Sequence, residues 1–187
     1  MNEEQKTVVL TGASRGIGHA TVKRFNDAGW RVLTCSREVF DSRCPWPGGK
    51  KNHIQVDLSD PKSTIEATDE IKDKLDGKLC ALINNAGVSP KLVDGQRLNS
   101  LETELKIWHQ VFQVNFFAPI LLAKALKNEL ERAKGAIVNV TSIAGSRVHP
   151  FAGAAYSTSK SALATLTREM AYDFGPLGVR VNAIAPG

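Results

Sequence analysis

Short apolar runs rich in β-branched residues alternate with longer segments of helical period along almost the whole sequence. Six runs are expected to form strands: residues 7–11, 31–35, 54–56, 79–84, 136–142 and 179–184. Four segments are expected to form helices, the third of them as one helix or as two pieces: residues 16–28, 62–75, 101–132 and 155–174. Strands of such continuous apolar character fit a sheet that is covered on both faces. The alternation therefore predicts an α/β fold, with a doubly wound parallel sheet and helices on both faces.

A chain of 187 residues with 42% hydrophobic content can bury one sizeable core, so residues 1–187 are expected to form a single domain. We find no internal repeat or linker in it. One Pro/Gly-rich stretch, DSRCPWPGGKK at residues 41–51, predicts a surface loop before the third strand. Doubly wound sheets bind ligands beyond the carboxyl ends of their strands, so functional residues are expected directly after each strand.

The composition excludes several classes of function. No apolar run approaches the roughly 20 residues that cross a bilayer, and the start MNEEQKTVVL is polar and acidic where a signal peptide is basic and then apolar. A cytoplasmic protein without a membrane partner is expected. The net charge of +5 is scattered, without a basic block of the kind that binds nucleic acid. Cys35, Cys44 and Cys80 lack the close pairing of a metal site or redox motif, so reduced structural thiols and no metal are expected.

The first expected strand runs into a glycine-rich turn, TGASRGIG at residues 11–18. Gly12, Gly16 and Gly18 permit a tight turn and let a phosphate approach backbone amides where no Cβ intervenes. The absence of Lys-Ser/Thr after the last glycine argues against a nucleoside triphosphate P-loop, and the spacing also differs from G-x-G-x-x-G. The turn predicts a phosphate-binding site. A sharp strand-to-helix connection without a ligand is the alternative.

Near the start of the last expected helix, the stretch AAYSTSK places Tyr156 and Lys160 four residues apart. Residues i and i+4 share one face of a helix, so both side chains can point into one cleft. A free phenol titrates at about 10, whereas an acid or base catalyst works best near the ambient pH, and a neighbouring ammonium favours the ionised phenol. The pair predicts proton transfer. The alternative is a tyrosine that packs against the stem of a lysine.

The sequence resembles the classical short-chain dehydrogenase/reductase family in motifs that follow the family's order through almost the whole chain. They are TGASRGIG at 11–18, DLSD at 57–60, NNAG at 84–87, VN at 114–115, VTS at 140–142, YSTSK at 156–160 and NAIAPG at 182–187. The resemblance implies a Rossmann-type fold and a nicotinamide cofactor.

The resemblance also implies roles for four catalytic residues. Tyr156 matches the residue that gives a proton to the carbonyl oxygen during reduction, or takes it from the alcohol during oxidation. Lys160 matches the residue that assists this tyrosine and hydrogen-bonds the nicotinamide ribose. Ser142 would hold the substrate oxygen beside the phenol. Asn115 matches the residue that maintains a water-linked proton relay from the lysine to solvent.

The end of the second expected strand bears on the choice between NAD and NADP. A carboxylate there would accept hydrogen bonds from the free ribose hydroxyl of NAD and repel a 2′-phosphate. The sequence instead has Ser36 and Arg37, and Arg15 lies in the glycine turn. Because two guanidinium groups that converge on one phosphate form a charge-assisted clamp, NADP(H) is expected and NAD is less favoured. Glu38 argues against this expectation, because a shift of one residue in the register of the strand end would bring its carboxylate into the site.

Other family positions are expected to line the cofactor site. Asp57 matches a residue whose side chain approaches the adenine ring, with Leu58 beside it, and Asn84 and Asn85 match a pair that secures the sheet. The full set expected to bind the cofactor is Gly12, Ser14, Arg15, Gly16, Ile17, Gly18, Ser36, Arg37, Asp57, Leu58, Asn84, Ala86, Gly87, Tyr156, Lys160, Pro186 and Gly187.

Substrate and subunit contacts are implied as well. His149 and Phe151 lie where the family places substrate contacts, with exposed loop positions as the alternative. Apolar residues recur at helical spacing around Asn115 and after Lys160, namely Phe112, Phe116, Phe117, Leu163, Leu166, Met170 and Phe174, and are expected to form core or subunit contacts. In the family these two long helices pair with their symmetry mates, so a homodimer or homotetramer is implied.

The expected function is NADP(H)-dependent interconversion of a carbonyl and a secondary alcohol. The motifs resemble those of 3-oxoacyl thioester reductases, with ketone, sugar and steroid reductases as alternatives, so the substrate stays open. Chains of the family normally continue through a substrate lid and a last strand, whereas this sequence ends at Gly187, as a fragment or as a short protein. A non-catalytic dinucleotide-binding or scaffolding protein is therefore the alternative. Sugar-nucleotide epimerases also use Tyr-x-x-x-Lys, but their glycine spacing differs and their chains are longer.

Overall fold

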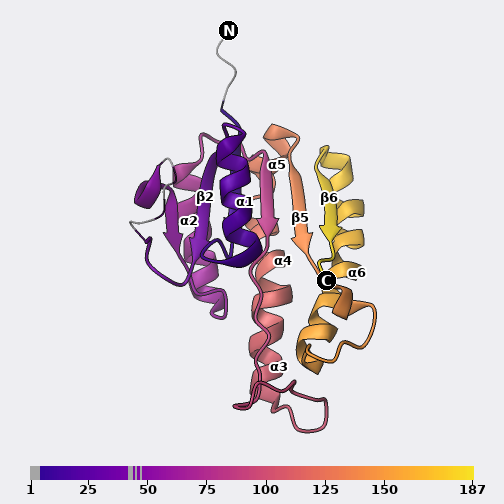
Figure 1. Cartoon of the computed structure of the whole chain (residues 1–187). Coiled ribbons are helices and arrows are strands. Elements are labelled where there is room, and N and C mark those ends of the chain that lie inside the picture. Colours follow the sequence, from indigo (N-terminus) through magenta and orange to yellow (C-terminus); the bar gives the residue numbers. More distant parts are fainter. Residues whose placement is uncertain (1–4, 42–43, 45, 47) are drawn as a thin grey trace.

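The computed structural model describes residues 5–41, 44, 46 and 48–187. Its centre is a six-stranded sheet in the order β3-β2-β1-β4-β5-β6, in which all neighbours pair in parallel (Figure 1). The strands are β1 Thr7–Thr11, β2 Arg31–Ser36, β3 His53–Gln55, β4 Ala81–Asn84, β5 Ala136–Val140 and β6 Arg180–Ile184. The strand order reverses between β1 and β4, which makes this the switch point of the sheet. The predicted doubly wound fold is confirmed.

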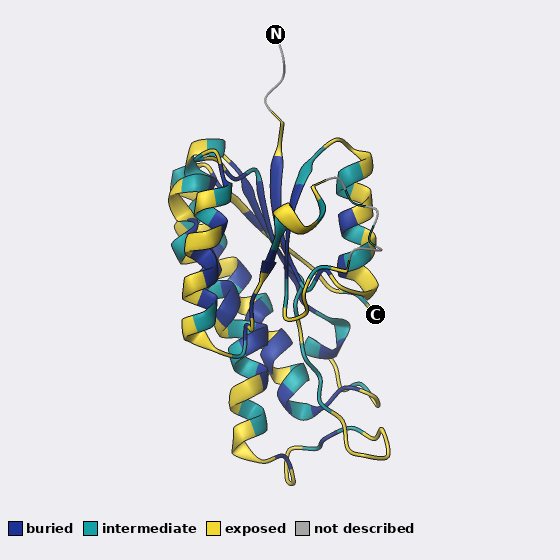
Figure 2. Ribbon diagram, turned by 90° about the vertical axis from the view of Figure 1, so that its left-hand side faces the viewer, coloured by how far each residue is buried: buried dark blue, intermediate teal, exposed yellow. Residues whose placement is uncertain are grey.

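Helices cover both faces of the sheet, and the central strands lie buried between them (Figure 2). The α-helices are α1 Gly16–Asp27, α2 Pro61–Lys74, α3 Leu105–Phe112, α4 Ala118–Ala125, α5 Lys127–Ala133 and α6 Ala154–Phe174. On one face, α2, α4 and α6 bury Ile71, Leu122 and Met170 in the larger core. On the other face, α1 buries Val22 in a second core, with side chains from β1 and β2. The two cores fix the sheet edge at which the strands end.

The helix expected over residues 101–132 is divided more than the sequence predicted. After α3 comes a π-helical segment, Gln113–Phe117, and then α4 and α5. Pro119 lies in the first turn of α4 and has no N–H to donate to the carbonyl group of Asn115. Regular α-helical bonding is therefore interrupted at this point, and the interruption takes the form of a π-bulge, a feature found frequently at functional sites.

The strand expected over 179–184 begins one residue later, and two other strands are shorter than expected by two residues because polar groups redirect the chain. The strand expected over 79–84 begins at Ala81, since the N–H of Leu79 donates to the carbonyl oxygen of Glu129 at 2.9 Å. The strand expected over 136–142 ends at Val140. Beyond it, the Ser142 hydroxyl oxygen accepts a hydrogen bond from the N–H of Ala144 at 3.2 Å and begins a 3-10 turn, Ile143–Gly145.

The expected surface loop at residues 41–51 falls partly outside the described residues, which omit 42, 43, 45 and 47, and so does the start of the chain at residues 1–4. Within the loop, Trp46 packs against the core on the α1 side, and its ring centre lies 4.8 Å from that of His19. A 3-10 turn, Gly49–Asn52, then leads into β3. The described part of the loop therefore covers α1.

Two expectations from composition can be compared with the structure. All three cysteines are free thiols, and complete burial raises the pKa of Cys35 to about 12, with a smaller contribution from the charge of Glu70. This thiol remains protonated at neutral pH. Among the described helices, none combines the length and the apolar character needed to span a membrane.

Candidate active site

A cleft follows the carboxyl ends of the strands at the switch point between β1 and β4. It consists of two adjoining cavities, of about 330 Å³ and about 530 Å³. The first lies over the ends of β1, β2 and β3, and the second over the ends of β5 and β6 and the start of α6. Four residues line both cavities: Arg15, Ile17, Asn85 and Gly87. A ligand with two halves can therefore extend from one cavity into the other.

The glycine turn between β1 and α1 brings two backbone segments into contact. Gly12 has a φ of +69°, and a Cβ on it would lie 2.8 Å from the Cα of Ala86. A Cβ on Gly18 would collide with the carbonyl oxygen of Gly12. Gly16 has open space around it but a φ of +55°. Close packing thus requires the first and third glycines, and the left-handed backbone favours the second.

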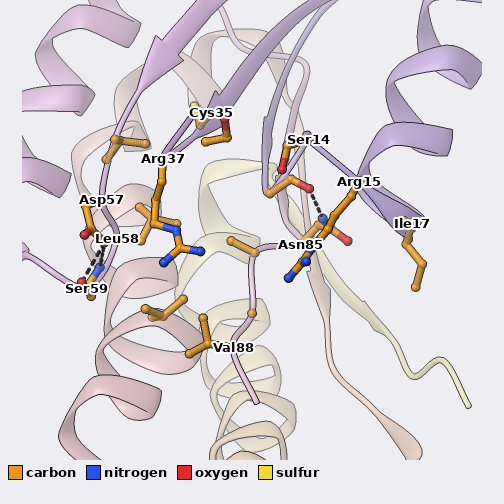
Figure 3. Close-up of a pocket in the computed structure, with 18 of the residues that line it drawn as sticks. Ser14, Arg15, Ile17, Cys35, Arg37, Asp57, Leu58, Ser59, Asn85 and Val88 are labelled. Atoms are coloured by element: carbon orange, nitrogen blue, oxygen red, sulfur yellow. Dashed lines mark hydrogen bonds between the residues drawn. The ribbon is translucent and has the colours of Figure 1, made fainter. Parts of the chain in front are cut away.

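Asn85 fixes the glycine turn to the end of β4. Its Nδ2 donates to the carbonyl oxygens of Thr11 and Gly12, both at 3.0 Å. The Thr11 hydroxyl oxygen accepts from the backbone N–H groups of Asn85 and Ala86, both at 3.1 Å. Asn85 also faces the cleft (Figure 3). From the sequence we expected only a structural role for Asn85, although its place in the NNAG motif was the signal that pointed to the site.

Asn84 was expected to contact the cofactor, but it does not line either cavity of the cleft. Its side chain is 2% exposed, and its Nδ2 donates to Oδ1 of Asn139 at 2.9 Å. Asn139 in turn donates to the hydroxyl oxygen of Thr167 at 3.0 Å. Because Asn84 is still part of β4, its side chain points into the packed face of the sheet and ties β4 and β5 to α6. The chain leaves the strand at the next residue.

Arg15 and Arg37 line the first cavity from different sides (Figure 3). Ser14 and Ser36 line it as well. Glu38 lies outside the described lining of both cavities, and its carbonyl oxygen accepts a hydrogen bond from the Ser36 hydroxyl at 3.1 Å. Arg37 therefore comes directly after the last residue of β2 and lines the first cavity, whereas Glu38 does not.

Asp57 and Leu58 line the same cavity directly after β3. The hydroxyl and backbone N–H of Ser59 donate to Oδ1 of Asp57 at 2.7 Å and 2.9 Å. These bonds, and to a lesser extent the positive charge of Arg37, lower the pKa of Asp57 below its usual value. Gln110 of α3 also lines the cavity. It belongs to no motif, and only the packing of α3 against the cleft brings it there.

The second cavity brings together Ser142, Tyr156 and Lys160. Ser142 follows β5, while Tyr156 and Lys160 lie one turn apart on α6, as predicted from their spacing. The Lys160 Nζ is 5.8 Å from the centre of the Tyr156 ring. An ammonium at that distance interacts electrostatically with the ring. The arrangement places a hydroxyl, a phenol and an ammonium around one space.

Lys160 is a buried charge with a hydrogen-bond partner. Its side chain lies among residues that leave it 2% exposed, and its Nζ donates to the carbonyl oxygen of Val140 at 2.6 Å. Burial lowers the pKa of Lys160 from its usual 10.5 to about 8. A lysine ammonium has three donors, so this bond leaves others for groups in the cleft.

Asn115 lies in the π-helical segment and holds the segment after β4 against α6. Its Oδ1 accepts from the N–H of Val88 at 2.8 Å, and its Nδ2 donates to the carbonyl oxygen of Val88 at 3.1 Å and to the Ser159 hydroxyl oxygen at 3.0 Å. A Cβ on Gly87 would lie 3.3 Å from the Lys160 Nζ and 3.5 Å from the Asn115 Oδ1. The backbone of Gly87 therefore lies close to both Asn115 and Lys160.

The residues directly after β6 lie along one side of the second cavity. Pro186 and Gly187 line this cavity, and the carbonyl oxygen of Pro186 accepts from the N–H of Ile143 at 3.1 Å. His149 and Phe151 line it from the segment between Ser142 and α6. Most of the Phe151 side chain remains exposed, so it lies at the mouth of the cavity.

The residues of this cleft fit a nicotinamide dinucleotide. The two cavities offer room for two nucleoside halves, and their shared part lies at the glycine turn. The first turn of α1 begins there, where the positive end of a helix and its free N–H groups favour a diphosphate. Gly16 also lines the first cavity, and a Cβ on it would meet no protein atom within 4 Å, so its side has room for such a group.

Comparison with known proteins gives the same picture. A family model for short chain dehydrogenase matches residues 6–187. Protein FixR of Bradyrhizobium diazoefficiens is 60% identical over 98% of this chain and 67% of its own length. An oxidoreductase of the short chain dehydrogenase/reductase family from Brucella ovis, in complex with a partially ordered NAD, is 66% identical with a TM-score of 0.94, over 98% of this chain and 84% of that one. A 3-oxoacyl-[acyl-carrier protein] reductase from Brucella melitensis with bound NAD is 31% identical with a TM-score of 0.86. The match covers 99% of this chain and 71% of that one.

Gly18→Ala should lower the free energy of unfolding by about 2 kcal/mol or more. The new methyl group would collide with the Gly12 carbonyl oxygen and lie 2.6 Å from Nδ2 of Asn85, which holds the turn. Gly175→Ala is the matched control, because its Cβ meets nothing within 4 Å and its φ is −54°. Urea denaturation of both variants tests this expectation, and equal stability of the two would contradict it.

Lys160→Met should change how stability depends on pH. Between the folded pKa of about 8 and the unfolded value of 10.5, the unfolded chain binds more protons at this lysine, so the free energy of unfolding rises with pH there. Below pH 8 the contribution is constant. As the pH rises through this window, the free energy of unfolding of the wild type should therefore increase by about 3 kcal/mol relative to that of Lys160→Met. Urea denaturation at several pH values measures the difference, with the exposed Lys62→Met as control. A difference that stays constant with pH would refute the expectation.

Proposed function

This chain belongs to the short chain dehydrogenase family of oxidoreductases, and we propose that it interconverts a carbonyl and a secondary alcohol by hydride transfer with a nicotinamide cofactor. The observation that carries the proposal is the location of Ser142, Tyr156 and Lys160 in one cavity that continues into the cleft beside the glycine turn. A protein that only bound a dinucleotide would have no need of a buried ammonium beside a phenol.

The nicotinamide, when bound, supplies or accepts the hydride. The side chains around the second cavity supply the proton and the orientation. Tyr156 gives its proton to the carbonyl oxygen during reduction and takes one from the alcohol during oxidation. The hydroxyl oxygen of Ser142 accepts from Ala144, so its hydrogen is free to bind the substrate oxygen and hold it beside the phenol.

Lys160 and Asn115 support this proton transfer. The Lys160 ammonium lies 5.8 Å from the centre of the Tyr156 ring, where its charge attracts the negative charge that develops on the phenol oxygen as the proton leaves. The bond from Nζ to the Val140 carbonyl oxygen fixes the ammonium at the end of β5, next to Ser142. Asn115 holds the Val88 backbone and Ser159 together, which keeps the segment after β4 in contact with α6. In this proposal it maintains the relay that returns protons to Lys160.

We propose NADP(H) as the preferred cofactor. Arg15 and Arg37 both line the first cavity, and the described lining there includes Ser36 but not Glu38. Two guanidinium groups favour a 2′-phosphate through charge-assisted hydrogen bonds. The Brucella ovis relative was solved with a partially ordered NAD. Since NAD has no 2′-phosphate, it would leave this pair of arginines in our chain without that contact.

A 3-oxoacyl thioester is the substrate class that we propose to test first. The 31% identical Brucella melitensis relative is a 3-oxoacyl-[acyl-carrier protein] reductase. In this chain, the exposed ring of Phe151 at the mouth of the second cavity offers an apolar contact for an acyl chain. Ser142 and Tyr156 would then bind the ketone oxygen at its inner end.

We also propose that the chain forms a homo-oligomer through its long helices. Met170 is part of the core, and Leu166 and Phe174 pack against it, so these residues serve the fold. Phe117, at the end of the π-helical segment, and Tyr172 on α6 remain exposed. These apolar side chains are available for a contact between subunits.

Tyr156→Phe should lower kcat by about a hundredfold or more, because the phenol provides the proton. The dissociation constant for NADPH should change by less than about twofold. The measurement is NADPH oxidation with a panel of ketones that includes a 3-oxoacyl thioester, together with a fluorescence titration. Tyr172→Phe is the matched control, since Tyr172 lies on the same helix and is 83% exposed.

Two results would count against this function. Undiminished turnover by Tyr156→Phe would remove Tyr156 from the mechanism. Tight NADPH binding by the wild type without turnover of any ketone would favour a dinucleotide-binding protein without catalysis.

Arg37→Asp should weaken NADPH binding about tenfold to a hundredfold, because it removes a charged donor and adds a charge that repels a phosphate. NADH affinity should change much less, so the ratio of the two affinities should fall. Fluorescence titration with each dinucleotide measures this ratio. Arg24→Asp makes the same charge change on the exposed side of α1, away from both cavities, and should leave the ratio unchanged. An unaltered ratio in Arg37→Asp would show that Arg37 does not bind the phosphate.

A further inference from the structure

We infer that His53 and Gln55 on β3 are positioning residues for cofactor selectivity, because they hold the backbone of Arg37 and Glu38 where β2 has ended. Neither side chain lines the first cavity. Both act through backbone carbonyl groups of the segment that presents the Arg37 guanidinium to this cavity. The inference rests on the proposed preference for NADP(H) and adds the residues that make it possible.

The backbone alone does not hold this segment to β3. The parallel ladder of β2 and β3 pairs Thr34 with His53 and Ser36 with Gln55, and it ends there. Among the described residues, the last backbone bond between the two segments runs from the N–H of Val56 to the carbonyl oxygen of Ser36 at 2.9 Å. The described residues between 37 and 47 form no helix or strand. Arg37 therefore begins an irregular connection directly after the last pair of the ladder.

Two side chains of β3 continue the pairing beyond this end. The Gln55 Nε2 donates to the carbonyl oxygen of Arg37 at 2.8 Å. The Nε2 of His53 is 2.9 Å from the carbonyl oxygen of Glu38, which also accepts from the Ser36 hydroxyl. Alternate residues of a strand point to the same face, so His53 and Gln55 reach the segment from one side. Each binds one of two consecutive carbonyl groups.

The partners of His53 define its hydrogen-bonding state. A carbonyl oxygen can only accept, so Nε2 carries the hydrogen that binds Glu38. In the neutral ring, Nδ1 then accepts from the Thr34 hydroxyl, 2.9 Å away. The Phe40 ring lies beside the imidazole, with the two ring centres 5.9 Å apart and the ring planes tilted by 55°. The ring is thus held between β2 and the segment that it binds.

These bonds matter for an anion in the first cavity because they fix both the position of Arg37 and the direction of its carbonyl group. A guanidinium forms strong phosphate contacts only in a defined geometry. The two carbonyl oxygens carry partial negative charge and are bound by donors that lie outside the cavity. Loss of these donors would free the segment to move and would weaken the contact of Arg37 with a 2′-phosphate.

The test uses Gln55→Leu, which keeps the size of the side chain and removes the donor. Gln5→Leu is the matched control, because the Gln5 Nε2 makes an equivalent bond to the carbonyl oxygen of Gly29 at 3.1 Å, at the other end of the sheet. For the wild type and both variants, dissociation constants for NADPH and NADH are measured by fluorescence titration. Limited trypsin digestion of each ligand-free protein then gives the rate of cleavage after Arg37, whose carbonyl group Gln55 binds.

We expect Gln55→Leu to lower the ratio of NADPH to NADH affinity about fivefold, and to be cleaved after Arg37 several times faster than the wild type. Gln5→Leu should change neither quantity. His53→Phe, which keeps a ring but loses both nitrogen contacts, should act in the same direction.

The outcomes separate this inference from the proposed cofactor preference. If the wild type shows no preference for NADPH but Gln55→Leu is cleaved faster, the proposed cofactor preference is rejected. The result would still support the conclusion that Gln55 fixes the backbone of Arg37 and Glu38. A wild type that prefers NADPH, combined with an unchanged ratio in Gln55→Leu, would overturn the inference and leave the preference standing. Equal weakening of NADPH and NADH binding would also overturn it, because a general loss of structure does not act on selectivity.

Discussion

The contact between the glycine turn after β1 and the segment after β4 is the constraint on which the rest of the cleft depends. Gly12 lies against the backbone of Ala86, and Gly18 lies against Gly12, at distances that no side chain permits. Asn85 and Thr11 then join the two segments by four hydrogen bonds. Because this contact lies at the switch point, it sets the N-terminus of α1, the shared wall of both cavities and the start of the segment that reaches Asn115.

The end of the cleft around Tyr156 and Lys160 contains a buried lysine, and burying its charge costs free energy. Burial disfavours the charged form of Lys160 and lowers its pKa to about 8. The Val140 carbonyl oxygen compensates part of this cost and fixes the ammonium at the end of β5. The same burial keeps water away from the ammonium, so its effect on the neighbouring phenol is less screened than at the surface. In the proposed mechanism, the burial that costs stability at Lys160 is also what strengthens its effect on the phenol.

Much of the fold and site could be predicted from the sequence, because the determining patterns are local. Alternating strand and helix periods gave the sheet and its layers, and the i, i+4 spacing gave the pairing of Tyr156 with Lys160. The errors lie where long-range contacts override local patterns. The division of the third helix by a π-helical segment follows from Pro119, yet its exact form depends on how Asn115 bonds to Val88 and Ser159. Asn84 was expected at the cofactor, but its side chain points into the sheet, and Asn85 takes the place in the cleft.

The sequence by itself determined the chemical groups of the site and their order along the chain: the glycine turn, the two arginines, and the serine, tyrosine and lysine. Each is encoded in a short motif whose spacing has a direct geometric meaning. Only the tertiary structure decided which groups share a cavity and which backbone supports them. His53, Gln55 and Gln110 belong to no motif, and their roles come from the register of β3 beside β2 and from the packing of α3. Such contacts join residues far apart in sequence, and local patterns carry no information about them.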